Sequence, residues 1–345
     1  MTYAKSFRRY EDWRGNNYFL FDGSILLGSD AKCLSISNSL LLLPAFFLFK
    51  DVVPYISEFK SYVYGVFFAG IFILLVSFYN LWMTALTEPG ILPRNEPHIR
   101  AELPPGANTV GANSWKYCET CNIYRPPRSK HCTSCQNCVE VFDHHCPWTG
   151  NCVAKRNYKY FYSFIIFVTA FAIYAVTLCT IVLTKNYFKH NGNADFLIEN
   201  PFALAVGIVS FICAWSLVSL CCYHMYLVYR GETTNENLRG LSLNNNPRII
   251  GNCIDLCCNT VEPSLLPDQS QMVTADEYIN SFSDLISLHL ENIRIERQKS
   301  NNYNSDSRQT STTASSSNAS YVSRVGQLQE PLLSHSEVGS NYGTN

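Results

Sequence analysis

Three long runs of the chain contain no charged side chain. Residues 62–82, 160–184 and 202–229 hold no Asp, Glu, Lys or Arg, and the runs are 21, 25 and 28 residues long. A helix needs roughly 20 apolar residues to cross about 30 Å of hydrocarbon. These runs therefore predict membrane-spanning helices rather than helices of a soluble core. The charged fraction of the whole chain, 15%, is low against the roughly 25% of ordinary globular proteins.

A fourth apolar run is shorter. It covers residues 34–49 and reaches spanning length only if Lys50 to Val53 are included. The Lys50 ammonium would then extend toward the lipid headgroups. The alternative is an interfacial or re-entrant helix. We predict four spans, at 34–53, 62–82, 160–184 and 202–229.

An even number of spans places both ends of the chain and the middle loop, 83–159, on one side of the membrane. Lys and Arg counts favour the cytosol for this side only weakly. The cysteines of the loop argue more strongly, because thiolate metal ligands persist best in a reducing compartment. We therefore expect a cytosolic amino-terminal segment (1–33), middle loop and carboxy-terminal region (230–299). Residues 1–10 lack the apolar core of a cleavable signal peptide.

The carboxy-terminal part changes in composition. Thr274 and Glu277 are spaced as a capping box, and apolar residues follow at helical spacing to about residue 299. This pattern predicts an amphipathic helix over 274–299, resting either on the membrane or on the protein's own surface. Residues 300–345 are dominated by Ser, Thr, Asn and Gln, so we expect a disordered tail.

Metal-binding residues concentrate in the middle loop. Residues 118–152 contain seven of the fifteen cysteines and three of the eight histidines. The pairs Cys118/Cys121 and Cys132/Cys135 have the two-residue gap that lets two sulfurs bind one tetrahedral ion. The segment has too few apolar residues to fold by burial alone, so we predict that zinc holds it together. The alternatives are disulfides or packed free thiols.

The number of donors leaves two side chains over. Two tetrahedral sites use eight ligands, and the segment offers ten Cys and His. The run Asp143-His144-His145-Cys146 contains the parts of an activated thiolate: a sulfur nucleophile, an imidazole base and a carboxylate to orient the imidazole. The alternative is that Cys146 and one histidine are ligands at a mixed site.

This pattern resembles the cysteine-rich domain of the DHHC protein S-acyltransferases. The spacing agrees from Cys118 to Cys152, and four spans with this domain between the second and third are also the family's layout. Weaker similarities flank it, covering about 34–258 in all. Glu88-Pro89-Gly90 resembles the family's Asp-Pro-Gly, Thr233-Thr234-Asn235-Glu236 resembles its Thr-Thr-x-Glu, and Asn252 matches a carboxy-terminal motif whose flanking aromatics are missing.

The resemblance implies an all-α polytopic membrane protein with four transmembrane helices, a small zinc-stabilised cysteine-rich cytosolic domain (core 118–152) and a disordered tail. It also implies two structural zinc ions, one held by Cys118, Cys121, His131 and Cys138 and the other by Cys132, Cys135, His145 and Cys152. Cys146 would then be the nucleophile, with His144 as its base, Asp143 orienting His144, and Thr234 approaching Asp143.

The implied function is protein S-acyl transfer. A long-chain acyl group, typically palmitoyl, would pass from acyl-CoA through a Cys146 acyl-enzyme to cysteines of membrane-associated substrate proteins. Arg125 and Arg128 would contact the CoA phosphates, with solvated loop charge as the alternative, and Trp148 would lie beside the thioester, with packing as its alternative. We expect an integral protein of the endomembranes (ER or Golgi) or plasma membrane. The net charge of −1 favours no nucleic-acid partner.

The remaining features favour other functions only weakly. Six further cysteines near the membrane are candidate acylation sites, although packed thiols are favoured: Cys33, Cys221, Cys222, Cys253, Cys257 and Cys258. His224 has no acidic partner in its run, so packing is the favoured role and a transporter is not indicated. A catalytically silent, zinc-stabilised membrane adaptor is the main competing hypothesis, and it would be indifferent to Cys146→Ser.

Overall fold

The computed structural model describes residues 6–56, 63–111, 114–241 and 260–273, together with residues 252, 254, 256 and 258. The amphipathic helix predicted over 274–299 and the disordered tail predicted over 300–345 lie outside the described residues.

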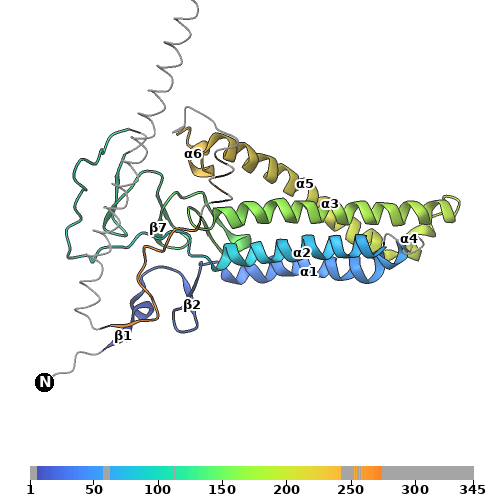
Figure 1. The fold of residues 1–345 in the computed structure, drawn as a ribbon, viewed down its shortest axis with the longest axis horizontal. Coiled ribbons are helices and arrows are strands. Elements are labelled where there is room, and N and C mark those ends of the chain that lie inside the picture. The colour runs from blue at the N-terminus through green and yellow to red at the C-terminus, as the bar shows by residue number, and fades with distance from the viewer. Residues whose placement is uncertain are drawn as a thin grey trace, which may run out of the picture. The chain divides into compact units, whose positions relative to one another are not determined.

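The described part of the chain contains four helices that are long and apolar enough to cross a membrane. Helix α1 (Leu34–Phe47) continues through a π-helical turn (Leu48–Val52), and α2, α3 and α5 run side by side with it (Figure 1). Their bounds are Val63–Leu86 for α2, Tyr158–Lys189 for α3 and Pro201–Arg230 for α5. The four predicted runs fall almost entirely within these helices.

Local sequence fixes the ends of α5. The Asn200 side chain accepts a hydrogen bond from the amide of Ala203 at 3.1 Å, and Pro201 occupies the first helical position, where no intrahelical amide bond is lost. Gly231 ends the helix with φ +67°, a left-handed conformation that favours glycine. The short helix α4 (Phe196–Glu199) links α3 to α5.

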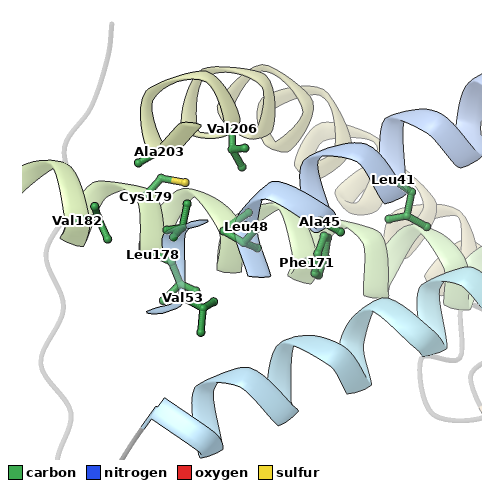
Figure 2. Packing of buried hydrophobic residues seen from close by; sticks show 12 residues of the cluster. Leu41, Ala45, Leu48, Val53, Phe171, Leu178, Cys179, Val182, Ala203 and Val206 are labelled. Carbon is green, nitrogen blue, oxygen red and sulfur yellow. The ribbon is translucent and has the colours of Figure 1, made fainter. Parts of the chain in front are cut away.

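The buried core of the helical part joins three of the long helices. Leu41, Ala45 and Leu48 meet Phe171 and Leu178 of α3, and Ala203 and Val206 of α5 close the cluster (Figure 2). Large apolar side chains also cover the outside of the helices, including Phe68, Phe72 and Trp215. Helices that are apolar all round are typical of membrane spans, because lipid replaces water on the outer faces.

The described chain between α2 and α3 has no α-helix and one short 3-10 helix, Pro147–Thr149, so the prediction of an all-α protein does not hold for this segment. Short two-stranded antiparallel hairpins form there: β4 (Lys116–Cys118) with β5 (Ile123–Arg125), β6 (Lys130–Cys132) with β7 (Asn137–Val139), and β8 (His144–Cys146) with β9 (Asn151–Val153). The reason is local: a Cys-x-x-Cys pair can face one ion only across a tight turn. Positive φ angles of 51° at Asn122 and 56° at Gln136 directly follow Cys121 and Cys135.

Two further pairs of antiparallel strands lie outside the cysteine-rich segment. Strand β2 (Tyr18–Leu20) pairs with β3 (Ile25–Leu27) just before α1. Strand β1 (Phe7–Arg8) pairs with β10 (Met272–Val273), which joins distant parts of the chain.

Candidate active site and metal centres

The alternation of side chains along β8 separates two kinds of chemistry. Successive residues of a strand point to opposite faces. His144 and Cys146 therefore share one face of the hairpin, while His145 between them points to the other, where it pairs across the ladder with Cys152. A single three-residue strand thus presents a metal ligand on one side and the two leftover donors on the other.

The same alternation in β6 divides ligands between two clusters. His131 and Cys132 are adjacent and face opposite ways, and His131 pairs across the ladder with Cys138. The first cluster consists of Cys118, Cys121, His131 and Cys138, and the second cluster of Cys132, Cys135, His145 and Cys152. The memberships match the two ligand sets that the family resemblance implies.

The donor atoms of both clusters fit tetrahedral zinc. Zinc binds sulfur at about 2.3 Å and nitrogen at about 2.0–2.1 Å, which puts nitrogen and sulfur roughly 3.5 Å apart at a tetrahedral angle. The Nδ1 atom of His131 lies 3.4–3.7 Å from its three sulfurs, and that of His145 lies 3.5–3.6 Å from its three. The sulfurs of Cys135 and Cys152 are 3.6 Å apart, far beyond the S–S bond length of about 2.0 Å. The geometry thus suits bound metal and not disulfides.

Cys146 belongs to neither cluster and lies against the first turns of α3. Its side chain is buried among Val153, Phe161 and Ile165. This sulfur is therefore surrounded by apolar side chains at the end of a candidate membrane helix.

Asp143 is the best-connected polar group of the site. Its carboxylate is 1% exposed and accepts a hydrogen bond from His144 Nδ1 at 2.6 Å. Thr234 provides two more, from its backbone amide to Oδ1 at 2.8 Å and from its hydroxyl to Oδ2 at 2.7 Å. Because Nδ1 of His144 carries the proton toward Asp143, Nε2 remains for Cys146.

These contacts shift the ionisation of all three groups. Burial opposes the charged form of Asp143, but the bonds from His144 and Thr234 prevail and its pKa lies below the ordinary value. Burial likewise opposes protonation of His144, yet hydrogen bonds to Asp143 and Cys146 raise its pKa to about 9. Burial raises the pKa of the Cys146 thiol, but hydrogen bonds with His144 and Thr149 outweigh it and lower that pKa. The arrangement favours a thiolate beside an imidazolium.

The short helix α6 (Thr234–Leu238) carries Thr234 to Asp143. A capping box starts this helix: the Thr233 hydroxyl accepts from the amide of Glu236 at 3.2 Å, and the Glu236 carboxylate accepts from the amide of Thr233 at 2.8 Å. Arg128 then donates to both oxygens of Glu236, at 2.6 and 2.8 Å. Arg128 thereby connects α6 to the cysteine-rich segment, a contact that residue types and spacing do not predict.

Arg125 lines the same pocket as Arg128, and Trp148 is not among the lining residues of that pocket. Arg125 lines a pocket with Lys116 and Arg239, donates to the Ser129 carbonyl at 2.7 Å, and has a buried Nε atom without a hydrogen-bond partner among the described residues. Trp148 lies two residues after Cys146 in the sequence and is 58% exposed. Both remain available for a bound molecule.

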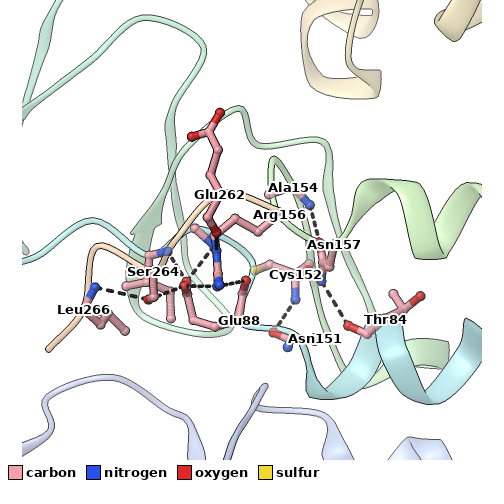
Figure 3. A network of polar contacts seen from close by, with 12 residues as sticks. Thr84, Glu88, Asn151, Cys152, Ala154, Arg156, Asn157, Glu262, Ser264 and Leu266 are labelled. Atoms are coloured by element: carbon pink, nitrogen blue, oxygen red, sulfur yellow. Dashed lines mark hydrogen bonds and ion pairs between the residues drawn. The ribbon is translucent and has the colours of Figure 1, made fainter. Parts of the chain in front are cut away.

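Buried amides attach the hairpin of β8 and β9 to the end of α2. Asn157 donates to the carbonyls of Thr84 at 3.0 Å and Cys152 at 2.8 Å (Figure 3), and Asn151 donates to the carbonyl of Ala85 at 3.0 Å. In the same network the Glu88 carboxylate accepts from the amide of Gly90 at 2.6 Å and pairs with Arg156 at 2.6 Å. The Glu88 carboxylate thus accepts a hydrogen bond from the backbone of the turn that follows it. The family motif has Asp at this position.

Two residues of the carboxy-terminal half also approach this region. The buried His224 of α5 hydrogen-bonds the Tyr158 hydroxyl at 3.0 Å, and its ring centre lies 6.0 Å from that of His144. The side-chain amide of Asn252 donates to the carbonyls of Val228 at 2.9 Å and Tyr229 at 3.2 Å, in the last turn of α5.

Comparison with known proteins accounts for this constellation. A family model described as DHHC palmitoyltransferase matches residues 112–240. Palmitoyltransferase ZDHHC18-B of Danio rerio is 35% identical over 312 residues, covering 79% of this chain and 78% of the relative. Probable protein S-acyltransferase 5 of Arabidopsis thaliana is 33% identical over 285 residues, covering 74% of this chain and 60% of the relative. Palmitoyltransferase ZDHHC14 of Homo sapiens is 34% identical over 294 residues, covering 75% and 59% respectively.

The chain thus spans between 59% and 78% of the length of these relatives. The matched region contains both cysteine and histidine clusters, the Asp143–Cys146 strand and Thr234. Four apolar helices, two metal-binding clusters and this degree of identity over most of the chain lead to one conclusion: the protein belongs to the DHHC palmitoyltransferase family.

Proposed function

We propose that this protein is a protein-cysteine S-acyltransferase in which Cys146 carries the acyl group. The observation that supports this most directly is the chain of contacts from Thr234 through Asp143 and His144 to Cys146, on the face of β8 opposite the metal cluster. Its relatives are named palmitoyltransferases and S-acyltransferases. We infer that long-chain acyl-CoA, typically palmitoyl-CoA, is the donor and that cysteines of membrane-associated proteins are the acceptors.

The proposed reaction has two thioester exchanges. In the first, the Cys146 thiolate attacks the thioester carbonyl of acyl-CoA, the carbon–sulfur bond to CoA breaks, and the CoA thiolate leaves with a proton from His144. In the second, His144 takes the proton of a substrate cysteine, whose sulfur attacks the acyl-enzyme and releases the Cys146 thiolate. General acid–base help of this kind contributes typically 100- to 10,000-fold.

The two metal clusters would hold structural zinc. Among the described residues each cluster consists of three sulfurs and one imidazole nitrogen, a donor set typical of a closed structural site. Zinc bound there would neutralise the clustered thiolates and hold the hairpins. The reacting sulfur remains outside both donor sets.

The membrane arrangement completes the proposal. We infer that α1, α2, α3 and α5 span the bilayer and that both chain ends and the hairpins face the cytosol, in an endomembrane or the plasma membrane. The position of Cys146 against the start of α3 supports a reaction at the membrane surface. An acyl chain entering among the spans would then need no aqueous path.

The function is tested by supplying a clickable palmitoyl-CoA analogue to purified protein in detergent. We expect a covalent label that hydroxylamine removes, because hydroxylamine cleaves thioesters. Folded, metal-loaded protein that stays unlabelled would instead favour the membrane adaptor.

Thr234 provides a test of the orienting role. Thr234→Val keeps the shape and the backbone bond to Asp143 but removes the hydroxyl bond. A hydrogen bond to a charged group contributes about 1.5–3 kcal/mol, so we expect kcat to fall roughly 10- to 150-fold with little change in KM. Steady-state transfer to a cysteine peptide measures this. Thr180→Val, which removes an exposed hydroxyl on α3, is the matched control and should be neutral. An unchanged kcat would remove Thr234 from the proposal.

Arg125 provides a test of the acyl-CoA contact. Its buried Nε has no hydrogen-bond partner among the described residues, and Arg125 lines a pocket with Lys116, Arg128 and Arg239, whose positive charge suits a phosphate. We expect Arg125→Gln to raise the KM for palmitoyl-CoA roughly 10-fold while kcat changes little. Arg100→Gln removes the same charge from an exposed loop and should leave KM unaltered. Equal effects from the two variants would mean that Arg125 acts only through general charge.

A further inference from the structure

We propose that Asp30 is a positioning residue for the second cluster, and that the segment before α1 provides the outer hydrogen-bonding shell of that metal centre. The inference rests on the proposed zinc binding and adds a residue from outside the cysteine-rich segment. The contact joins residues 115 positions apart. It links the start of the first candidate span to the strand that carries Cys146.

The geometry of His145 carries the argument. Its Nδ1 atom faces the sulfurs of Cys132, Cys135 and Cys152 at 3.5–3.6 Å, while its Nε2 atom lies 2.7 Å from Oδ2 of Asp30. A neutral imidazole that binds metal through Nδ1 carries its proton on Nε2. The Asp30 carboxylate accepts a hydrogen bond from this Nε2–H group. That bond fixes the tautomer and the ring orientation of His145 and makes its metal-binding nitrogen, Nδ1, more basic.

Neighbouring residues of the same segment reinforce this contact. The Ser29 hydroxyl lies 3.7 Å from the Cys135 sulfur, within hydrogen-bond distance for sulfur. Asn16 donates its backbone amide to the Cys135 carbonyl and its side-chain amide to the Ser134 carbonyl, both at 2.9 Å. The amino-terminal segment therefore contacts both the imidazole and the Cys-x-x-Cys turn of the second cluster.

Two glycines allow the backbones to approach closely enough. A Cβ added at Gly28 would lie 2.3 Å from the carbonyl oxygen of Gly150, a distance that no side chain can occupy. Gly150 has φ +69°, and a Cβ there would lie 3.0 Å from the Cα of Ala31. The backbone of the loop before α1 thus packs closely against the turn between β8 and β9.

Among the described residues the imidazole of the first cluster has no carboxylate partner, although the Asn95 amide donates to the Cys121 carbonyl at 3.1 Å. Within the part of the chain that the structure describes, His131 hydrogen-bonds only through Nδ1 to the sulfurs of its own cluster. The two centres should therefore respond differently to loss of Asp30. Because His145 lies between His144 and Cys146, loosening of the second cluster also frees the catalytic strand.

The experiment measures metal retention cluster by cluster. Purified full-length protein in detergent is challenged with a zinc chelator and N-ethylmaleimide, and mass spectrometry follows the alkylation of each cysteine over time. Zinc content per chain is measured before the challenge. The variants are Asp30→Asn, which keeps the shape but removes the charge, Asp30→Ala, and the control Asp22→Asn in an exposed ion pair with Arg8.

We expect Cys132, Cys135 and Cys152 to be alkylated about 10- to 100-fold faster in both Asp30 variants than in wild type. Cys118, Cys121 and Cys138 should keep the wild-type rate, and Asp22→Asn should change neither set. Equal rates in all proteins, or equal acceleration of both clusters, would overturn the positioning role of Asp30. Wild-type protein with fewer than two zinc ions would instead refute the proposed metal centres themselves.

Discussion

Cys146→Ser is expected to abolish acyl transfer, lowering it at least 1,000-fold, while leaving both metal clusters intact. A serine hydroxyl in the same place is not ionised near neutral pH, so neither the attack on the thioester nor a hydroxylamine-sensitive intermediate remains. The fold should survive because each cluster already has four donors without Cys146. The measurement is transfer of a palmitoyl analogue to a cysteine peptide, together with zinc content per chain.

Cys222→Ser is the matched control for this variant. Cys222 is an exposed thiol on α5 that lies outside the hairpin of β8 and β9. Its loss should leave transfer to the peptide at the wild-type rate. A Cys146→Ser protein that retains a tenth of the activity would contradict the proposed nucleophile, and one that loses a zinc ion would show that Cys146 is a ligand.

The spans could be predicted from the sequence because lipid imposes one simple rule, an uncharged run of sufficient length. Their ends could not be placed as well. The run 160–184 ends just before Lys185, but α3 continues to Lys189, because a charge ends the hydrocarbon segment without breaking helical hydrogen bonds. The π-helical turn at Leu48–Val52 left no pattern in the sequence that distinguishes it from ordinary helix.

The candidate site was predictable as far as local spacing determines it. The Cys-x-x-Cys pairs indicated metal, and the family pattern implied which donors share an ion. The hairpins explain that division physically, because adjacent residues such as His131 and Cys132 face opposite ways in a strand. That reason required strand assignments that three-residue strands do not reveal in a sequence.

Contacts between distant segments were beyond sequence reasoning. Arg128 was expected at the acyl-CoA, yet its guanidinium is engaged by Glu236, 108 residues away. No sequence pattern around Asp30 predicts that it lies beside His145. Such pairs depend on how hairpins and helices pack, and neither residue type nor local spacing encodes that packing.

Removal of zinc is expected to unfold the cysteine-rich segment while the spans stay helical. Each hairpin has strands of only three residues, and isolated two-stranded hairpins are marginally stable at best. The small apolar clusters around them include all six cysteines of the two donor sets. A structural zinc site contributes about 10–16 kcal/mol of apparent binding energy. That equals or exceeds the total stability of a typical domain, about 5–15 kcal/mol.

The measurement is treatment of purified protein with a strong zinc chelator, followed by metal analysis, limited proteolysis and circular dichroism. We expect two zinc ions released per chain, new cleavage between residues 88 and 157, retained helical signal, and at least a 100-fold loss of Cys146 labelling. The same chelator saturated with zinc is the control and should change nothing. Metal-free protein that resists proteolysis and still labels Cys146 would mean that side-chain packing, not metal, holds the catalytic strand, because the nucleophile would then keep its place with both clusters empty.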